Sequence, residues 1–303
     1  MSRHRRSNPA ATRRLNRFMS SEQPLFFECA GDELLGILHH PEDQQVRNGV
    51  LMVVGGPQYR VGSHRLFVLI ARQLADAGIP VFRFDYRGMG DSPGGPLDFE
   101  VISDDIRAAA DAFIQHAGGI DGVILWGLCD AATANAFYAI DDDRVVGQVA
   151  LNPWVRTTEG EARTFIKHYY PRRALSGSFW LKLASLKYDL SSVFKEFLAY
   201  LRSSVGAHGN SHGGTHVPLP TRLRDAQTQF AAQTLLIVSG QDLTAKEYEF
   251  SVESSPEWQA WLASPKVEMR KLDKADHTFS TEAWTKQVAA WSQDWVKKLG
   301  REA

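Results

Sequence analysis

Apolar runs and amphipathic segments alternate along most of the chain. Continuous apolar runs predict buried strands, and apolar residues at every third or fourth position predict helices. The stretch 25–38 alternates around a break at "AGDE" and predicts an antiparallel hairpin. The expected strands are 48–57, 79–88, 122–127, 144–154, 234–242 and 267–277, and the expected helices are 64–77, 98–117, 130–140 and 281–298.

This order of elements predicts an α/β protein with a mostly parallel, doubly wound sheet and helices on both faces. Such sheets bind ligands at the carboxyl ends of their strands. The alternation stops at about 155–230, where helical patterns lead into the Gly- and His-rich "GAHGNSHGGTHVPLP". An insertion between two strands at that edge predicts a helical lid, or cap, over the binding site.

The first 18 residues contain six arginines and no acidic residue. They lack the apolar core of a secretory signal. We therefore expect residues 1–20 to be a disordered basic tail and residues 21–303 to form the folded domain. An arm that binds nucleic acid or an anionic membrane is the alternative interpretation.

Composition is that of an ordinary globular protein, with 44% hydrophobic and 23% charged residues and a net charge of −1. This balance gives no reason to expect a nucleic-acid partner. The only two cysteines, Cys29 and Cys129, lack the clustered spacing of a zinc site, so no metal or cofactor is expected. They suggest a reducing compartment, hence a cytoplasmic protein, and no apolar run reaches the roughly 18 residues of a membrane span.

The segment "LWGLCDAAT", residues 125–133, places Cys129 between a predicted strand and a predicted helix. Gly127 and Ala131 lie two residues to either side, and a sharp strand-to-helix turn needs such small neighbours. The positive end of the following helix favours a thiolate. Cys129 is therefore a candidate nucleophile, although a buried structural cysteine is the plainer interpretation of the motif alone.

A cysteine nucleophile needs a base, and the base needs an orienting acid. In this type of sheet the order along the chain is nucleophile, acid, histidine, each after a strand. Asp242 follows the strand "TLLIVSG", and His277 follows the strand that begins "VEMRKL". Asp242 alone could be a turn residue and His277 a surface histidine, but together with Cys129 they predict a catalytic triad.

The same chemistry requires an oxyanion hole. One donor is expected to be the backbone N–H of Asp130, the residue after the nucleophile. The second is expected from the loop "GGPQY" at 55–59. Pro57 has no N–H to donate, so we expect Gln58 to be the donor, with Gly56 as second choice. A simple tight turn is the alternative interpretation of this loop.

Several further residues are candidate substrate contacts. Tyr59 and Arg60 stand beside the oxyanion loop, where they could meet an anionic substrate. Asp85 and Arg87, in "RFDYRGMGDS", are expected instead to tie their loop to its neighbours. In the cap, Phe194 and Phe197 are expected to line an acyl pocket, with contact of its basic face to a membrane as the minor alternative.

The motifs "VVGGPQYRVGSHR", "RFDYRGMGDS", "LWGLCDAA", "SGQDLTA" and "ADHTFS" together resemble the exosortase-A-system-associated α/β-hydrolases, specifically the first of their two types. The resemblance covers roughly residues 24–299. It implies the α/β-hydrolase fold and a bacterial enzyme from a locus concerned with exopolysaccharide and protein sorting. It also implies that Cys129, Asp242 and His277 are the catalytic residues.

The expected activity is cleavage of a small-molecule ester or thioester through a covalent acyl-enzyme. An acyltransferase using the same intermediate is one alternative, since a thioester reacts readily with amines and thiols. A non-catalytic binding protein on the same scaffold is the other. The sequence does not predict the acyl group, the leaving group or the oligomeric state.

Overall fold

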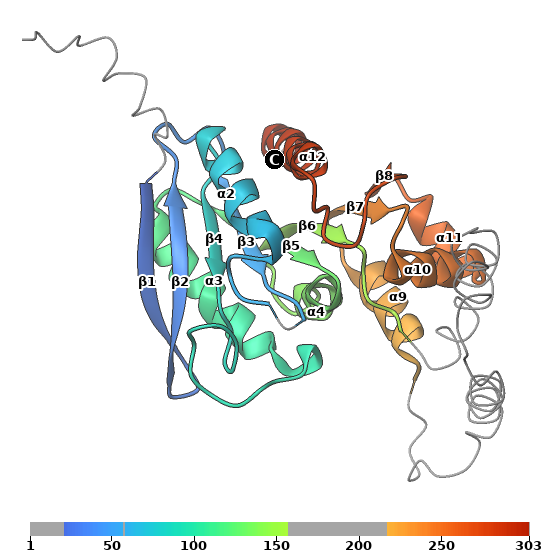
Figure 1. Ribbon diagram of the computed structural model, residues 1–303, viewed down its shortest axis with the longest axis horizontal. Coiled ribbons are helices and arrows are strands. Elements are labelled where there is room, and N and C mark those ends of the chain that lie inside the picture. Colours follow the sequence, from blue (N-terminus) through green and yellow to red (C-terminus); the bar gives the residue numbers. More distant parts are fainter. Residues whose placement is uncertain (1–20, 57, 157–216, 303) are drawn as a thin grey trace, which may run out of the picture.

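A computed structural model of the protein describes residues 21–56, 58–156 and 217–302, and one eight-stranded sheet runs through them in the order β1-β2-β4-β3-β5-β6-β7-β8 (Figure 1). The strands are β1 Ser21–Cys29, β2 Asp32–His40, β3 Asn48–Val53, β4 Val81–Phe84, β5 Gly122–Leu128, β6 Val145–Leu151, β7 Gln233–Ser239 and β8 Val267–Leu272.

The sheet is antiparallel at one edge and parallel elsewhere. Strand β1 pairs antiparallel with β2, and β2 pairs antiparallel with β4. All pairs from β4 to β8 are parallel. The turn between β1 and β2 contains Ala30 and Gly31, with φ of 52° and 88°. The predicted hairpin and the predicted mostly parallel, doubly wound sheet are both confirmed.

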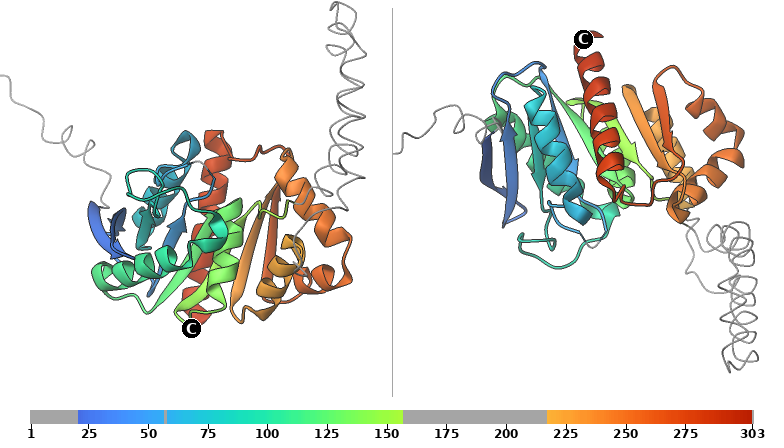
Figure 2. Two further views of the ribbon diagram at one scale, coloured as in Figure 1. Left: turned by 90° about the horizontal axis from the view of Figure 1, so that it is seen from below. Right: turned by 45° about the horizontal axis from the view of Figure 1, so that its top comes forward.

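Helices cover both faces of the sheet (Figure 2). Helices α2 and α12 share a hydrophobic core on one face, and α3 and α4 pack on the other. The helices are α2 Leu66–Asp76, α3 Ser103–Ala117, α4 Asp130–Ala139, α9 Leu219–Gln229, α10 Leu243–Glu253, α11 Pro256–Leu262 and α12 Glu282–Glu302, with short 3₁₀ turns η1 Ser63–Arg65 and η2 Phe99–Val101.

Strand β3 explains why its sequence is continuously apolar. Val50 and Met52 point into the core shared with α2 and α12, whereas Leu51 and Val53 point into the core shared with α3 and α4. All four side chains are fully buried. A strand covered on both faces has no solvent-facing positions, so its polar–apolar alternation disappears.

Helix α9 lies within the predicted cap, and it packs against α4 and α11. Residues 157–216, most of the predicted cap, and residues 1–20, the predicted tail, lie outside the described residues, so both expectations stay predictions. In the described part of the chain, no helix is both long enough and apolar enough to cross a membrane.

Candidate active site

Cys129 occupies the sharp turn between β5 and α4. Its backbone has φ 65° and ψ −127°, a conformation that non-glycine residues rarely adopt. The turn is fixed by hydrogen bonds from Cys129 N–H to the Leu151 carbonyl (2.8 Å) and from Trp154 N–H to the Cys129 carbonyl (3.2 Å). Strained backbone of this kind persists where the surrounding structure over-determines it. The thiol is free and half-buried.

Gly127 is small because α4 packs directly against it. A Cβ on Gly127 would lie 2.6 Å from Nδ2 of Asn135 and 2.9 Å from backbone atoms of Ala131 and Ala132. Ala131 itself is fully buried. The close packing around Cys129 therefore requires small residues at positions 127 and 131, as expected from the sequence.

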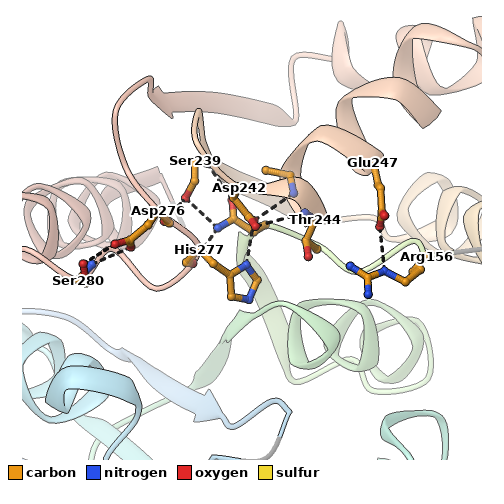
Figure 3. A network of polar contacts seen from close by, with 10 residues as sticks. Arg156, Ser239, Asp242, Thr244, Glu247, Asp276, His277 and Ser280 are labelled. Atoms are coloured by element: carbon orange, nitrogen blue, oxygen red, sulfur yellow. Dashed lines mark hydrogen bonds and ion pairs between the residues drawn. The ribbon is translucent and has the colours of Figure 1, made fainter. Parts of the chain in front are cut away.

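The structure brings Cys129, Asp242 and His277 together at the carboxyl ends of β5, β7 and β8. Nδ1 of His277 lies 2.8 Å from Oδ2 of Asp242 (Figure 3). Cys129 lies beside the same imidazole, and its thiol contributes to the raised pKa of that ring. Because Nδ1 faces Asp242, Nε2 is the ring nitrogen left for the sulfur.

The environment of His277 favours its protonated form. Burial lowers the pKa of His277, but the hydrogen bonds and charges of Asp242 and Cys129 outweigh burial and raise the pKa to about 10. Asp242 is held in place by the first turn of α10, whose Thr244 and Ala245 N–H groups donate to its carboxylate at 3.2 and 3.1 Å. The arrangement favours a protonated His277 that can donate from Nε2.

Asn152 and Ser239 hold the loop that carries His277, and sequence reasoning missed both. Asn152 Nδ2 donates to the His277 carbonyl (3.0 Å) and to Ser239 Oγ (2.9 Å), and its Oδ1 accepts from Ser239 N–H (2.8 Å). Ser239 Oγ donates to the Asp276 carbonyl at 2.7 Å (Figure 3). Asn152 directly follows β6, which lies in the sheet between β5, the strand before Cys129, and β7, the strand before Asp242. This position could have identified Asn152 from the sequence as a residue near the site.

The loop after β3 turns sharply beside the nucleophile. Gly56 has φ 60°, which favours glycine. The Gln58 N–H donates to the Gly56 carbonyl at 2.8 Å, and the Gln58 side-chain oxygen accepts from Ser63 N–H at 3.0 Å. Gln58 therefore lies in the expected loop, and its N–H already has a partner.

The Gly56 N–H, the second-choice oxyanion donor, is committed to a different group. It donates to Oδ2 of Asp130 at 2.9 Å, and Oδ1 of Asp130 accepts from Ala131 N–H at 3.0 Å. Burial raises the pKa of the Asp130 carboxyl, and the backbone N–H groups of Gly56, Ala131 and Asp130 itself offset this only in part. The side chain of Asp130 thus joins the loop to the nucleophile turn.

Arg60 forms ion pairs with two carboxylates of the loop after β4, and these neutralise its charge. Its guanidinium pairs with buried Asp85 and, at 2.7 Å, with Asp91. The backbone N–H of Arg60 also donates to the Asp85 carboxylate, at 2.6 Å. Tyr59 is 46% exposed beside it. Contact of either residue with substrate stays a prediction, and for Arg60 it requires release from these two carboxylates.

Asp85 and Arg87 tie their loop to its surroundings, as expected. Asp85 accepts the bonds from Arg60 and the Asp91 N–H at 3.1 Å. Arg87 makes a two-pronged contact with buried Asp105 at 2.8 and 3.0 Å. Phe194 and Phe197 lie outside the described residues. Within the described ranges, no group of three metal-ligating side chains converges.

The fold and this arrangement at the strand ends define an α/β hydrolase. The sequence profile of the alpha/beta hydrolase family matches residues 50–291, and the chain belongs to that family. It is also 25% identical over 225 residues to human Protein ABHD12B, a match that covers 71% of this chain and 51% of the human protein. The chain thus spans about half the length of that relative.

Solved structures confirm the fold. The Pyrococcus furiosus esterase Pf2001 superposes with a TM-score of 0.63 at 15% identity, covering 93% of this chain and 92% of that one. The esterase domain of a Rhodothermus marinus protein superposes with a TM-score of 0.56 at 19% identity, covering 92% and 99%. At these identities the likeness establishes the fold and leaves the chemistry to the site.

Proposed function

We propose that the protein hydrolyses a small-molecule ester or thioester with Cys129 as nucleophile, His277 as acid and base, and Asp242 as the residue that orients His277. The observation that carries this proposal is the shared imidazole. One ring of His277 hydrogen-bonds the Asp242 carboxylate at 2.8 Å and lies beside the Cys129 thiol, which contributes to the raised pKa of that ring. Two similar folds belong to an esterase and an esterase domain, which supports ester chemistry.

In the first half-reaction the Cys129 thiolate attacks the substrate carbonyl carbon, and the carbonyl oxygen becomes an oxyanion. Collapse of this intermediate breaks the bond to the leaving alcohol or thiol, which takes the Nε2 proton of His277. The products of this step are an acyl-cysteine and a neutral imidazole. Asp242 keeps the ring in the tautomer that presents Nε2 to the sulfur.

In the second half-reaction neutral His277 takes a proton from water, and the resulting hydroxide attacks the acyl-cysteine carbonyl. The second oxyanion collapses, the Cys129 sulfur leaves as thiolate, and the acid is released. The thiolate–imidazolium pair is thereby restored. The raised pKa of His277, about 10, favours the protonated resting form that this cycle starts from.

The oxyanion is proposed to accept the Asp130 N–H at the start of α4 and the Gln58 N–H. Gln58 donates to the Gly56 carbonyl in the free chain, so it has to exchange that partner for the oxyanion. Gly56 is a poorer candidate, because its N–H donates to the carboxylate of Asp130, a stronger acceptor than the carbonyl that Gln58 has to give up.

We also propose a cellular setting for the reaction. Both cysteines are free, which fits a cytoplasmic enzyme. We retain the resemblance to exosortase-associated hydrolases as a proposal for the genetic setting. Phe194 and Phe197 of the predicted cap remain proposed acyl contacts.

The proposal is tested by steady-state hydrolysis of p-nitrophenyl esters and acyl thioesters of two to ten carbons. We expect turnover by the unmodified protein and none above background by Cys129→Ala. Turnover of the whole panel by Cys129→Ala at the unmodified rate would overturn the proposed nucleophile. Acid release that gives way to amide formation when an amine is added would identify acyl transfer as the main reaction.

A further inference from the structure

The Asp130 side chain has no part in the proposed reaction cycle, although it follows the nucleophile directly. Its carboxylate bridges two segments that are 74 residues apart in sequence, accepting from Gly56 N–H at 2.9 Å and from Ala131 N–H at 3.0 Å. Gly56 belongs to the loop that leads to Gln58, and Ala131 to the first turn of α4. These are the two segments that carry the proposed oxyanion donors.

The carboxylate is well suited to this position. The first N–H groups of a helix have no partner within the helix, and the helix end attracts negative charge. Hydrogen bonds from backbone N–H to an ionised carboxylate are stronger than neutral ones. Asp130 therefore gives a half-buried, charge-assisted link where α4 alone would leave an N–H unsatisfied.

Gly55 makes the link possible. A Cβ on Gly55 would collide with Oδ1 of Asp130, and it would also lie 2.7 Å from the Leu128 carbonyl oxygen and 2.9 Å from Ala131 N. Gly55 does not have the positive φ of Gly56. The first glycine of the pair is thus explained by the space that the carboxylate and the nucleophile turn occupy.

We propose that Asp130 is a positioning residue whose carboxylate fixes the oxyanion loop against the nucleophile turn, so that Gln58 and the Asp130 N–H converge on one oxygen. The proposal rests on the hydrolase function proposed above. Asp130 then has two roles. Its backbone N–H donates to the oxyanion, and its side chain forms a brace, the hydrogen-bonded link from the carboxylate to Gly56 N–H and Ala131 N–H. Gly56 is then part of the brace and does not donate to the oxyanion.

Two reactions of the Cys129 thiol distinguish a loss of oxyanion stabilisation from a loss of thiol reactivity. Turnover of p-nitrophenyl butyrate passes through an oxyanion, whereas alkylation by iodoacetamide does not. In Asp130→Asn the amide NH₂ replaces one acceptor oxygen and opposes an N–H donor, and in Asp130→Ala both acceptors are lost. We expect kcat to fall about 10- to 100-fold in both variants, somewhat less than when an oxyanion donor is removed. KM and the alkylation rate should stay within about threefold.

Asp142 provides a matched control at the other end of α4. Its carboxylate is buried, and it accepts from Arg144 at 2.7 to 3.0 Å and from Tyr138. Asp142→Asn should lower the free energy of unfolding while leaving kcat on p-nitrophenyl butyrate within about twofold. An equal loss of kcat in Asp142→Asn and Asp130→Asn would overturn the positioning role, because the effect would then follow the stability of α4.

Three other results would also overturn it. An unchanged kcat in Asp130→Asn would mean that the link does not position the donors. A raised kcat would mean that the carboxylate blocks the hole. A parallel fall in kcat and alkylation would place its effect on the thiol. Absence of turnover by the unmodified protein would instead contradict the proposed function, and the role of Asp130 would fall with it.

Discussion

Oδ2 of Asp242 accepts the Nδ1–H of His277 at 2.8 Å while the same carboxylate caps helix α10. The acid that orients the histidine is thus fixed to a rigid element by two backbone N–H groups. A side chain with no freedom to rotate can hold one tautomer of His277.

Asp242→Asn and His277→Ala are each expected to lower kcat/KM for p-nitrophenyl butyrate by about 10²- to 10⁴-fold. Because the members of a triad act as a unit, the double variant should lose little more than His277→Ala alone. The check is steady-state kinetics on all four proteins, with urea unfolding to correct for folded fraction. A double loss equal to the product of the single losses would show that the two residues act independently.

The two cysteines form a natural comparison. Cys129 lies half-buried at the end of β5, whereas Cys29 ends β1 and is 5% exposed. Burial raises the pKa of the Cys29 thiol, which keeps it protonated and unreactive. We expect Cys129→Ala to abolish ester turnover, and Cys29→Ala to keep it while lowering the free energy of unfolding. Equal activity per folded molecule in the two variants would refute this assignment.

The sheet and its order of elements were predictable because strands buried on both faces leave continuous apolar runs, as in β3. The triad was predictable for a related reason. Parallel strands bring their carboxyl ends to one edge, so Cys129, Asp242 and His277 could be placed there from their order alone.

Other features depend on contacts between segments that no local pattern reveals. The sequence allows Arg60 to face a substrate, yet the fold pairs it with Asp85 and Asp91 from another loop. The sequence placed Asn152 inside the expected strand 144–154, whereas β6 ends at Leu151 and the bonds of Asn152 to Ser239 and the His277 loop follow from strand order. Helices α10 and α11 were missed because they follow β7 closely in a stretch without strong apolar periodicity.

Asn152 should matter for both stability and rate. It is fully buried, has φ 43°, and makes three hydrogen bonds to Ser239 and the His277 carbonyl. Asn152→Ala leaves buried groups without partners and should lower the free energy of unfolding by about 1–3 kcal/mol. At a temperature where the variant is fully folded, kcat should still fall, because His277 is less well placed. Full kcat in that folded variant would reduce Asn152 to a purely structural role.

The charge on His277 should make part of the stability depend on pH. The folded pKa, about 10, lies above the ordinary 6.5, so the stabilising contribution is complete below about pH 6.5. It declines as the pH rises through the window up to about 10 and is then lost. Urea unfolding from pH 6 to 10.5 should therefore show the advantage of the unmodified protein over His277→Gln shrinking with pH.

A matched variant refines that measurement. Since Cys129 contributes to the raised pKa of His277, the decline should finish at lower pH when it is measured in a Cys129→Ala background. A pH-independent difference between the unmodified protein and His277→Gln would contradict the thiolate–imidazolium arrangement.

Cys129 is proposed to carry the acyl group, and mass spectrometry of the acid-quenched protein detects that acyl-enzyme. The protein is mixed with p-nitrophenyl butyrate or a butyryl thioester, quenched within the first turnovers and digested. We predict a butyryl mass on the peptide containing Cys129, absent from the peptide containing Cys29, and persisting longer in His277→Gln that has been acylated to the same level. Release of p-nitrophenol with no acyl group on Cys129 at any quench time, in either protein, would rule out Cys129 as the nucleophile.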